Sequence, residues 1–147
     1  MRYIRISMIR KKVDTMGTQI KAEFQVLSWQ ETPYEEPEQG AKLLRIAVKK
    51  SFRGPIEAES SAELLMCQGE GNSAGYVASE RVSGSIEGRM GTFVIQHGGA
   101  LVKGQPDFSF GYVVPGSGTG ALQGLRGSCA FQHDASGAVF TLDYSFE

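Results

Sequence analysis

Four ionisable side chains lie in segments where apolar and polar residues alternate, and each of them occupies a position where the alternation calls for an apolar residue. They are Lys50, Glu80, His97 and His133. Glu80, for example, lies between Ala78 and Val82 in a stretch whose alternate positions are polar. A charged group on an interior face is unfavourable unless it is paired. These positions therefore predict polar side chains that converge inside the fold.

A glutamate beside a histidine in an apolar cavity could carry out acid–base chemistry. Such a carboxylate serves as general base and the imidazole as acid when burial shifts their pKa values. Tyr76 lies four residues before Glu80, so in a strand its side chain is on the same face, and it adds a hydroxyl group. We take Glu80, His97 and Tyr76 as the catalytic candidates. The competing interpretation is a hydrogen-bonded core glutamate, with both histidines at strand ends where a bulge changes the parity.

Eight segments with alternating apolar and polar residues could position these side chains. This period of two is typical of half-buried strands. The apolar members run through residues 20–26, 44–52, 56–66, 76–82, 93–95, 108–114, 125–131 and 140–146. Glycine-containing turns such as Gly69-Glu70-Gly71 separate the segments. Residues 57–67 could also form a turn of helix, but their alternation favours a strand.

Sequential antiparallel strands with one apolar face must close on themselves or pack against a second sheet. Eight strands suffice for a barrel that encloses its side chains or one small ligand. We therefore predict an all-β chain with an eight-stranded antiparallel barrel and a small central cavity, and a two-sheet sandwich is the alternative. Trp29 has the parity opposite to Phe24 and Val26, so we expect a bulge near Leu27 and Ser28 to turn it inward.

The composition is that of one globular domain. The chain has 147 residues, 41% of them hydrophobic and 21% charged, with a net charge of −1. These values exclude a disordered chain, and they lack the basic surface of a nucleic-acid binder. No apolar run is long enough to cross a bilayer as a helix. We expect no nucleic-acid or membrane partner and a cytoplasmic location.

Residues 1–17 differ from the remainder and are assigned to a basic N-terminal extension, with residues 18–147 as the barrel domain. The first fourteen residues hold five of the 15 lysines and arginines. They lack the apolar core of a signal peptide. A leader without function, with Met16 as an alternative start, and a true N-terminal strand are both open.

Neither a metal site nor a cofactor is expected. Two cysteines, Cys67 and Cys129, lie 62 residues apart without a CxxC pair, and two distant histidines form no zinc signature. The cysteines are expected to be buried thiols, with a disulfide as the alternative. Residues 115–120 resemble a phosphate loop but lack the lysine and the following helix of a Walker motif, so a tight connection between strands is expected.

One long stretch resembles the signature of a small, mostly bacterial family of unknown function. It runs from Tyr76 to His97 and reads YVASERVSGSIEGRMGTFVIQH. Further marks are the WQE triplet at 29–31, VVPGSGTG at 113–120 and LQGLRG at 122–127. The likeness extends from about Thr18 to Phe146. Members of this family resemble allene oxide cyclase-type, calycin-like barrels, which implies an eight-stranded antiparallel barrel with a central cavity and brings no assigned activity.

The function we expect first is binding of a small, largely hydrophobic molecule in the barrel, without catalysis. Candidate ligand contacts are Trp29, Lys50, Tyr76, Glu80, Phe93, His97, Phe110 and Tyr144. A cyclase- or isomerase-like enzyme using Glu80 is the second hypothesis. The third is a structural, homo-oligomeric protein whose barrel is filled by Phe24, Phe93, Phe110, Phe140 and Tyr144. A ligand pocket of several hundred Å³ would discriminate among them.

Overall fold

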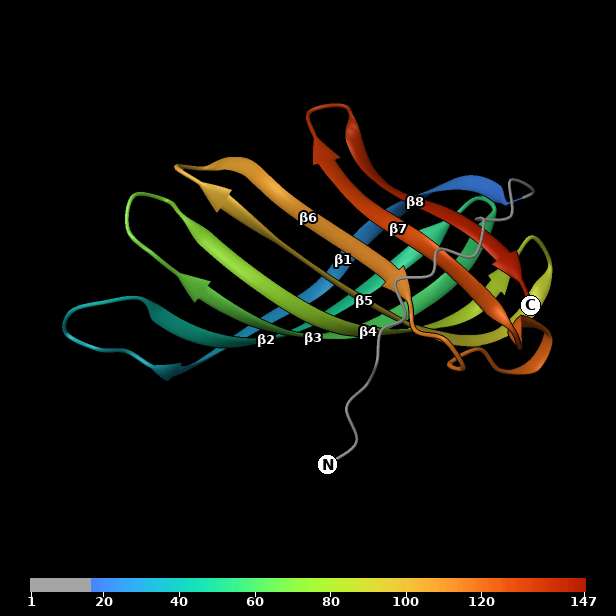
Figure 1. Cartoon of the computed structure of the whole chain (residues 1–147), viewed down its shortest axis with the longest axis horizontal. Helices are drawn as coiled ribbons and strands as arrows, with labels where there is room; N and C mark the ends of the chain where they lie inside the picture. Colours follow the sequence, from blue (N-terminus) through green and yellow to red (C-terminus); the bar gives the residue numbers. More distant parts are fainter. Residues whose placement is uncertain (1–16) are drawn as a thin grey trace, which may run out of the picture.

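The computed structural model describes residues 17–147 as one closed antiparallel barrel of eight strands (Figure 1). The strands are β1 Thr18–Glu35, β2 Lys42–Arg53, β3 Ile56–Gln68, β4 Ala74–Ile86, β5 Arg89–Val102, β6 Gln105–Val113, β7 Leu125–Asp134 and β8 Gly137–Phe146. Each strand pairs with its neighbours in the chain, and β8 closes the barrel on β1. The predicted barrel is confirmed, and the sandwich alternative is wrong.

Alternating burial explains why these segments form strands of one barrel. Along β4, Ala78, Glu80 and Val82 are buried, whereas Ser79 and Arg81 are exposed. Residues 57–67 belong to β3, so the helical alternative is also wrong. Within residues 17–147 no helix is long and apolar enough to cross a membrane. Residues 1–16, which include most of the predicted basic extension, lie outside the described part of the chain.

The two ends of the barrel differ in how they are closed. At one end, which we call the packed end, the β6–β7 connection folds across the opening and carries a short 3-10 helix, Gly120–Leu122. Leu122 is fully buried there. Thr119 donates its backbone N–H to the carbonyl of Thr92 at 2.8 Å. The carbonyl of Thr119 lies so close to Gly91 that a Cβ at this position would be 2.0 Å away.

Residues 115–120 therefore have a structural role in this connection. Ser117 Oγ accepts a hydrogen bond from the backbone N–H of Val94 at 3.0 Å, and Thr119 Oγ1 accepts one from Thr92 at 3.0 Å. Both hydroxyls and the backbone N–H of Thr119 are thus directed at β5. The loop is the strand connection that its sequence predicted.

The opposite end, called the hairpin end, consists of the β1–β2, β3–β4, β5–β6 and β7–β8 turns. In Figure 1 the first three turns lie at the left, and the β7–β8 turn points upward, away from them. Between β6 and β7 the aligned pair is Tyr112 with Ser128, whereas β7 and β8 stay in register from Leu125 to Asp134. The barrel wall is therefore weakest between β6 and β7 on the side of the hairpin end.

The interior contains two apolar clusters with polar side chains between them. The larger cluster fills the packed end and includes Phe52, Phe93, Ile95 and Phe140. The smaller one lies toward the hairpin end and includes Leu44, Ile46, Val48 and Leu64. The buried polar or charged residues among 17–147 are Lys50, Ser60, Glu80 and His97.

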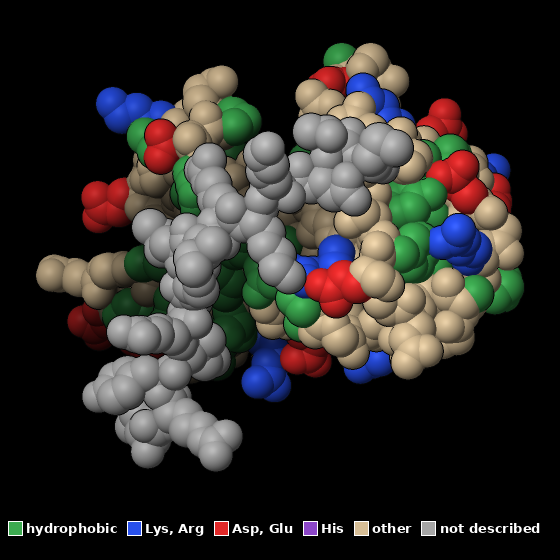
Figure 2. Space-filling model, turned by 45° about the vertical axis from the view of Figure 1, so that its right-hand side comes forward, with side chains coloured by type: hydrophobic (Ala, Val, Ile, Leu, Met, Phe, Trp, Pro, Cys, Tyr) green, Lys and Arg blue, Asp and Glu red, His purple; other side chains and the backbone are tan. Residues whose placement is uncertain are grey.

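The predicted inward placement of Phe110 is wrong. Phe108, Phe110 and Tyr112 lie on the outer face of β6, and Phe110 is 40% exposed. Its ring lies against Gly98 of β5, where a Cβ would be 2.6 Å from Phe110 Cε1. The inner face of β6 instead carries Gly111, packed against Cys129, and Val113. Figure 2 shows how hydrophobic side chains lie among mixed positive and negative ones on one outer face.

We expect Phe93→Ala to destabilise the barrel strongly, because Phe93 is 1% exposed in the larger cluster. Truncation of a buried phenylalanine costs about 3–5 kcal/mol of unfolding free energy. Phe108→Ala is the matched control, since Phe108 is 59% exposed. Urea unfolding of both variants measures the difference. Equal losses would contradict the assignment of inner and outer faces.

Candidate functional site

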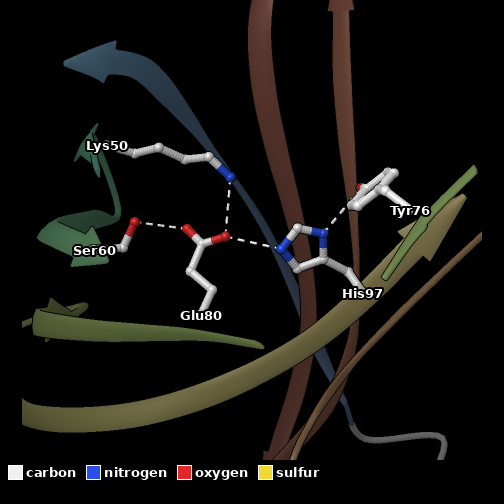
Figure 3. A network of polar contacts seen from close by, with 5 residues as sticks. All are labelled: Lys50, Ser60, Tyr76, Glu80 and His97. Atoms are coloured by element: carbon white, nitrogen blue, oxygen red, sulfur yellow. Dashed lines mark hydrogen bonds and ion pairs between the residues drawn. The ribbon is translucent and has the colours of Figure 1, made fainter. Parts of the chain in front are cut away.

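A single carboxylate organises the polar layer of the barrel. Glu80 is 0% exposed. Its Oε1 accepts hydrogen bonds from Lys50 Nζ and His97 Nε2, each at 2.9 Å, and its Oε2 accepts one from Ser60 Oγ at 2.6 Å (Figure 3). Both oxygens are therefore engaged by donors from other strands.

Strand register brings these groups to the same level of the barrel. Lys50 on β2 is opposite Ser60 on β3, and Glu80 on β4 is opposite Ile95 on β5. His97 lies two residues beyond Ile95, so its side chain enters the interior on the same face. A buried ion pair is stable only when further hydrogen bonds satisfy its remaining polar atoms. Ser60 and His97 provide those bonds to Glu80.

The polar layer extends from His97 to Tyr76. The hydroxyl of Tyr76 lies 3.0 Å from His97 Nδ1. Because the Glu80 carboxylate accepts, the protonated Nε2 of His97 is its donor. In a neutral ring Nδ1 then accepts the proton of the Tyr76 hydroxyl. Glu80 thereby orients His97, and His97 orients Tyr76.

The pKa shifts of this layer follow from burial and from the partners. Burial is the largest influence on Glu80 and raises its pKa, but the hydrogen bond from His97, the charge of Lys50 and the hydrogen bond from Ser60 together lower the pKa below its usual 4.5. Glu80 is thus ionised at neutral pH. Burial, and next the negative charge of Glu80, raise the pKa of Tyr76 above 10.0, so its phenol stays protonated.

A pocket of about 260 Å³ opens from this layer toward the hairpin end. Its lining is mainly apolar: Phe24, Val26, Trp29, Val48, Leu64, Met66 and Phe131. Lys50, Tyr76, His97 and His133 contribute the polar part. Glu80 is not among the lining residues. Its carboxylate lies behind Lys50 and His97 and acts on the pocket through them.

Aromatic rings hold the polar residues of the pocket in place. Lys50 Nζ lies 3.9 Å from the ring centroid of Phe131. The rings of His97 and Phe131 are 4.8 Å apart, and those of Phe24 and Phe131 are 5.2 Å apart in an edge-to-face arrangement. An ammonium over an aromatic face is stabilised by the ring quadrupole. Phe131 therefore supports the Lys50 ammonium in addition to Glu80.

A larger hollow of about 730 Å³ lies on the outer face of β2, β3 and β4. Exposed side chains such as Lys49, Glu63 and Arg81 line it. These ionic groups face solvent and make no converging hydrogen-bond network. The barrel pocket is the better candidate because its polar groups are buried and mutually oriented.

The structure brings together five of the eight predicted ligand contacts. Lys50, Tyr76, Glu80 and His97 form the polar layer, and Trp29 lines the pocket. The register of β1 with β2 shifts between Val26 and Ser28, which is the predicted bulge, and Trp29 is 48% exposed. His133 is also at the pocket, near the end of β7, whereas His97 is well inside β5 rather than at a strand end.

Three predicted contacts do not reach the pocket. Phe93 is part of the solid core at the packed end, and Phe110 is on the outer surface. Tyr144 has the predicted inward parity but packs at the packed end, where its hydroxyl donates to Glu87. The alternation predicts whether a side chain lies on the inner or the outer face of the barrel. The level of that side chain along the barrel axis depends on how neighbouring strands are aligned.

Several residues of the site are not among the eight predicted contacts. The pocket is also lined by Phe24, Val26, Val48, Leu64, Met66, Phe131 and His133, and Ser60 completes the polar layer. Ser60 lies on the apolar parity of β3, between Ala58 and Ala62, and this interruption was a usable signal for a buried hydroxyl. Phe131 was assigned to a strand interior but not to a site. Its role depends on β7 lying across from β2, which no local pattern reveals. Arg89 lies outside this layer, with its guanidinium carbon 4.3 Å from the ring centroid of Phe146.

Among residues 17–147 no group of three histidine, cysteine or acidic side chains could hold a metal ion. Both cysteines are free, so the disulfide alternative is wrong, and Cys129 is buried whereas Cys67 is half-buried. The arrangement that remains is a hydrogen-bonded chain from Glu80 through His97 to Tyr76, and the Lys50 ammonium beside an apolar pocket.

Comparison with known proteins identifies the family of this barrel. The sequence profile described as "protein of unknown function (DUF3224)" matches residues 20–146. The chain belongs to the DUF3224 family. A crystal structure at 1.84 Å resolution of a protein with unknown function from the DUF3224 family of Shewanella oneidensis MR-1 is similar, with a TM-score of 0.79 and 35% sequence identity. The match covers 89% of this chain and 98% of that chain.

A search of curated proteins gave no significant match. The resemblance seen in the sequence to a family of unknown function is confirmed, and the likeness of that family to allene oxide cyclases has no support among these comparisons. For DUF3224 barrels a function must therefore be argued from the site itself.

Glu80→Gln should destabilise this DUF3224 barrel at neutral pH, because it leaves the buried Lys50 ammonium without its counter-charge. Loss of one partner of a buried ion pair costs about 3–5 kcal/mol. The pKa of Glu80 is lower in the folded than in the unfolded protein. Its contribution to the unfolding free energy is therefore fully present above the unfolded-state pKa and disappears as the pH falls through the folded-state pKa. The difference between wild type and Glu80→Gln should therefore shrink below about pH 4.5.

Urea unfolding as a function of pH tests this expectation, with the exposed Glu63→Gln as the matched control on the neighbouring strand. Glu63→Gln should change stability little at any pH. A Glu80→Gln variant as stable as wild type at pH 7 would show that the carboxylate charge is not needed in the barrel.

The thiol of Cys129 should be unreactive in the folded protein. Burial, and next the charge of Glu80, raise the pKa of Cys129 to about 12, so little thiolate exists at pH 8. In a Cys67→Ser variant, labelling with iodoacetamide should require unfolding, and mass spectrometry measures it. Rapid labelling under native conditions would show that this side of β7 opens readily.

Proposed function

We propose that this protein binds a small, largely hydrophobic molecule inside the barrel at the hairpin end. The observation that carries the proposal is the apolar pocket of about 260 Å³ above the polar layer of Glu80, Lys50 and His97. A core without ligand usually fills such space with its own side chains. Here the packed end is filled, whereas the hairpin end keeps a pocket beside the smaller apolar cluster.

The size and lining of the pocket set the kind of ligand. Its volume lies just below the range of roughly 300–1,000 Å³ that is usual for ligand pockets. A compact molecule with one ring or a short branched chain matches it. Phe24, Trp29 and Phe131 offer aromatic contacts, and Met66 adds an adaptable side chain. The weakly paired β6–β7 wall lies beside Phe131 and offers a side through which a ligand could enter.

Two other hypotheses from the sequence have less support. A role for Glu80 as the group that attacks or deprotonates a substrate is disfavoured, because its oxygens are bonded to Lys50, Ser60 and His97 and it does not line the pocket. An enzyme in this barrel would act through Tyr76, with His97 as a positioning residue. A homo-oligomer with a completely filled barrel does not match the open pocket, and oligomerisation itself stays a prediction.

Trp29 allows a direct test, because it is the single tryptophan of the chain and lines the pocket. Titration with para-isopropylacetophenone should change its emission in a saturable way, with a Kd of about 1 mM or below. Val26→Phe narrows the pocket mouth and should weaken binding about tenfold through overpacking. Calorimetry measures the same affinities without relying on fluorescence.

The matched control is Val77→Phe, the same change at an exposed position on the outer face of β4. It should bind the probe like wild type. A linear, unsaturable response, or equal loss in both variants, would contradict a site inside the barrel. Native mass spectrometry of the freshly purified protein would reveal a molecule that co-purifies.

A further inference from the structure

The ammonium of Lys50 has hydrogen-bonding capacity beyond its ion pair. An ammonium group has three N–H donors. Among residues 17–147 the oxygen within hydrogen-bonding distance of Nζ is Glu80 Oε1 at 2.9 Å, and the ring of Phe131 lies at 3.9 Å. Lys50 also lines the pocket. At least one N–H of Lys50 is therefore left for a molecule in the pocket.

The polar side of the pocket offers a ligand few free hydrogen-bond acceptors. Glu80 Oε1 already accepts from Lys50 and His97, and Oε2 accepts from Ser60. Tyr76 uses its hydroxyl proton on His97 when the imidazole is neutral. A hydrocarbon placed against this side would separate the spare donor of Lys50 from water without replacing the lost hydrogen bond, which is unfavourable. A ligand cation would be repelled by Lys50.

We propose that the bound molecule carries an oxygen acceptor, from a carbonyl or a carboxylate, that receives a hydrogen bond from Lys50 Nζ. Its apolar body lies against the aromatic wall of Phe24, Trp29 and Phe131. This inference rests on the proposed function and specifies the chemical class of the ligand. Lys50 is then the residue that selects it.

The two sources of the acceptor differ in charge. The charges of Glu80 and Lys50 cancel, so a neutral carbonyl leaves this side of the pocket neutral. A carboxylate adds a negative charge, which makes it a stronger hydrogen-bond acceptor than a carbonyl. It can therefore compete with His97 Nδ1 for the proton of the Tyr76 hydroxyl. Loss of this hydroxyl therefore affects the binding of an acid and leaves the binding of a ketone nearly unchanged.

A matched series of four probes with one apolar body tests the proposal. The probes are para-isopropylbenzoate, para-isopropylacetophenone, para-isopropyltoluene and para-isopropylbenzylamine, titrated by calorimetry and by Trp29 emission. We expect the tighter of the acid and the ketone to bind at least about tenfold more strongly than the hydrocarbon and the amine, as for a hydrogen bond to a charged donor. Whichever of the two binds better identifies the source of the oxygen.

Lys50→Met should reduce the affinity of that oxygen ligand to the level of the hydrocarbon, whereas the exposed neighbour variant Lys49→Met should not change it. Tyr76→Phe should weaken the acid alone. If Lys50→Met does not fold, the carbonyl carbon resonance of the labelled ketone, or the carboxyl resonance of the labelled acid, gives the answer in the wild-type protein. A downfield shift of the bound ketone relative to the same ketone in cyclohexane supports the hydrogen bond.

The outcomes separate the two proposals. Binding of the hydrocarbon as tightly as the oxygen ligands, or tightest binding of the amine, overturns this inference and leaves the barrel pocket as a binding site. A bound ketone whose carbonyl resonance equals that in cyclohexane also overturns it. Absence of binding by all four probes overturns the proposed function and this inference together.

Discussion

The structure depends on the buried carboxylate of Glu80 and on the donors that surround it. An ionised glutamate in a barrel interior is tolerated only if other strands present partners at the same level. Lys50 from β2, Ser60 from β3 and His97 from β5 do so. A shift of one residue in any of these strands would turn its partner to the outside. The ion pair thus adds specificity for one register to the apolar packing of the barrel.

This polar layer also divides the interior into two parts that differ in how closely their side chains are packed. On one side, Phe52, Phe93 and Phe140 fill the barrel, and the β6–β7 connection with Leu122 covers its end. On the other side the strands end in hairpin turns, and β6 separates from β7 beyond Tyr112. The well-packed end supplies stability, and the looser end contains the pocket of about 260 Å³.

The same layer supplies the polar groups of the pocket. Glu80 holds His97 in one orientation, and His97 in turn holds Tyr76, so a chain of hydrogen bonds ends in a hydroxyl at the pocket. Lys50 is shared between Glu80, the ring of Phe131 and the pocket. Membership of the DUF3224 family assigns no activity, and the chemistry of these side chains is the reason to expect a small oxygen-containing ligand.

The sequence by itself determined the strands and the inward placement of Lys50, Glu80 and His97, because a period of two fixes which residues share a face. It favoured a closed barrel over a two-sheet sandwich, but closure itself was decided by the pairing of β8 with β1. The sequence also predicted the bulge that turns Trp29 inward, since a large aromatic surface opposed the local parity. Only the tertiary structure decided which face of β6 is interior: Gly98 leaves room for Phe110 outside, and Cys129 requires a glycine at 111 inside. It also decided that Tyr144 and Phe93 belong to the packed end, and that Phe131 meets Lys50. Those positions depend on the stagger of neighbouring strands around a closed barrel, which arises from pairing between distant segments and leaves no mark in any single strand.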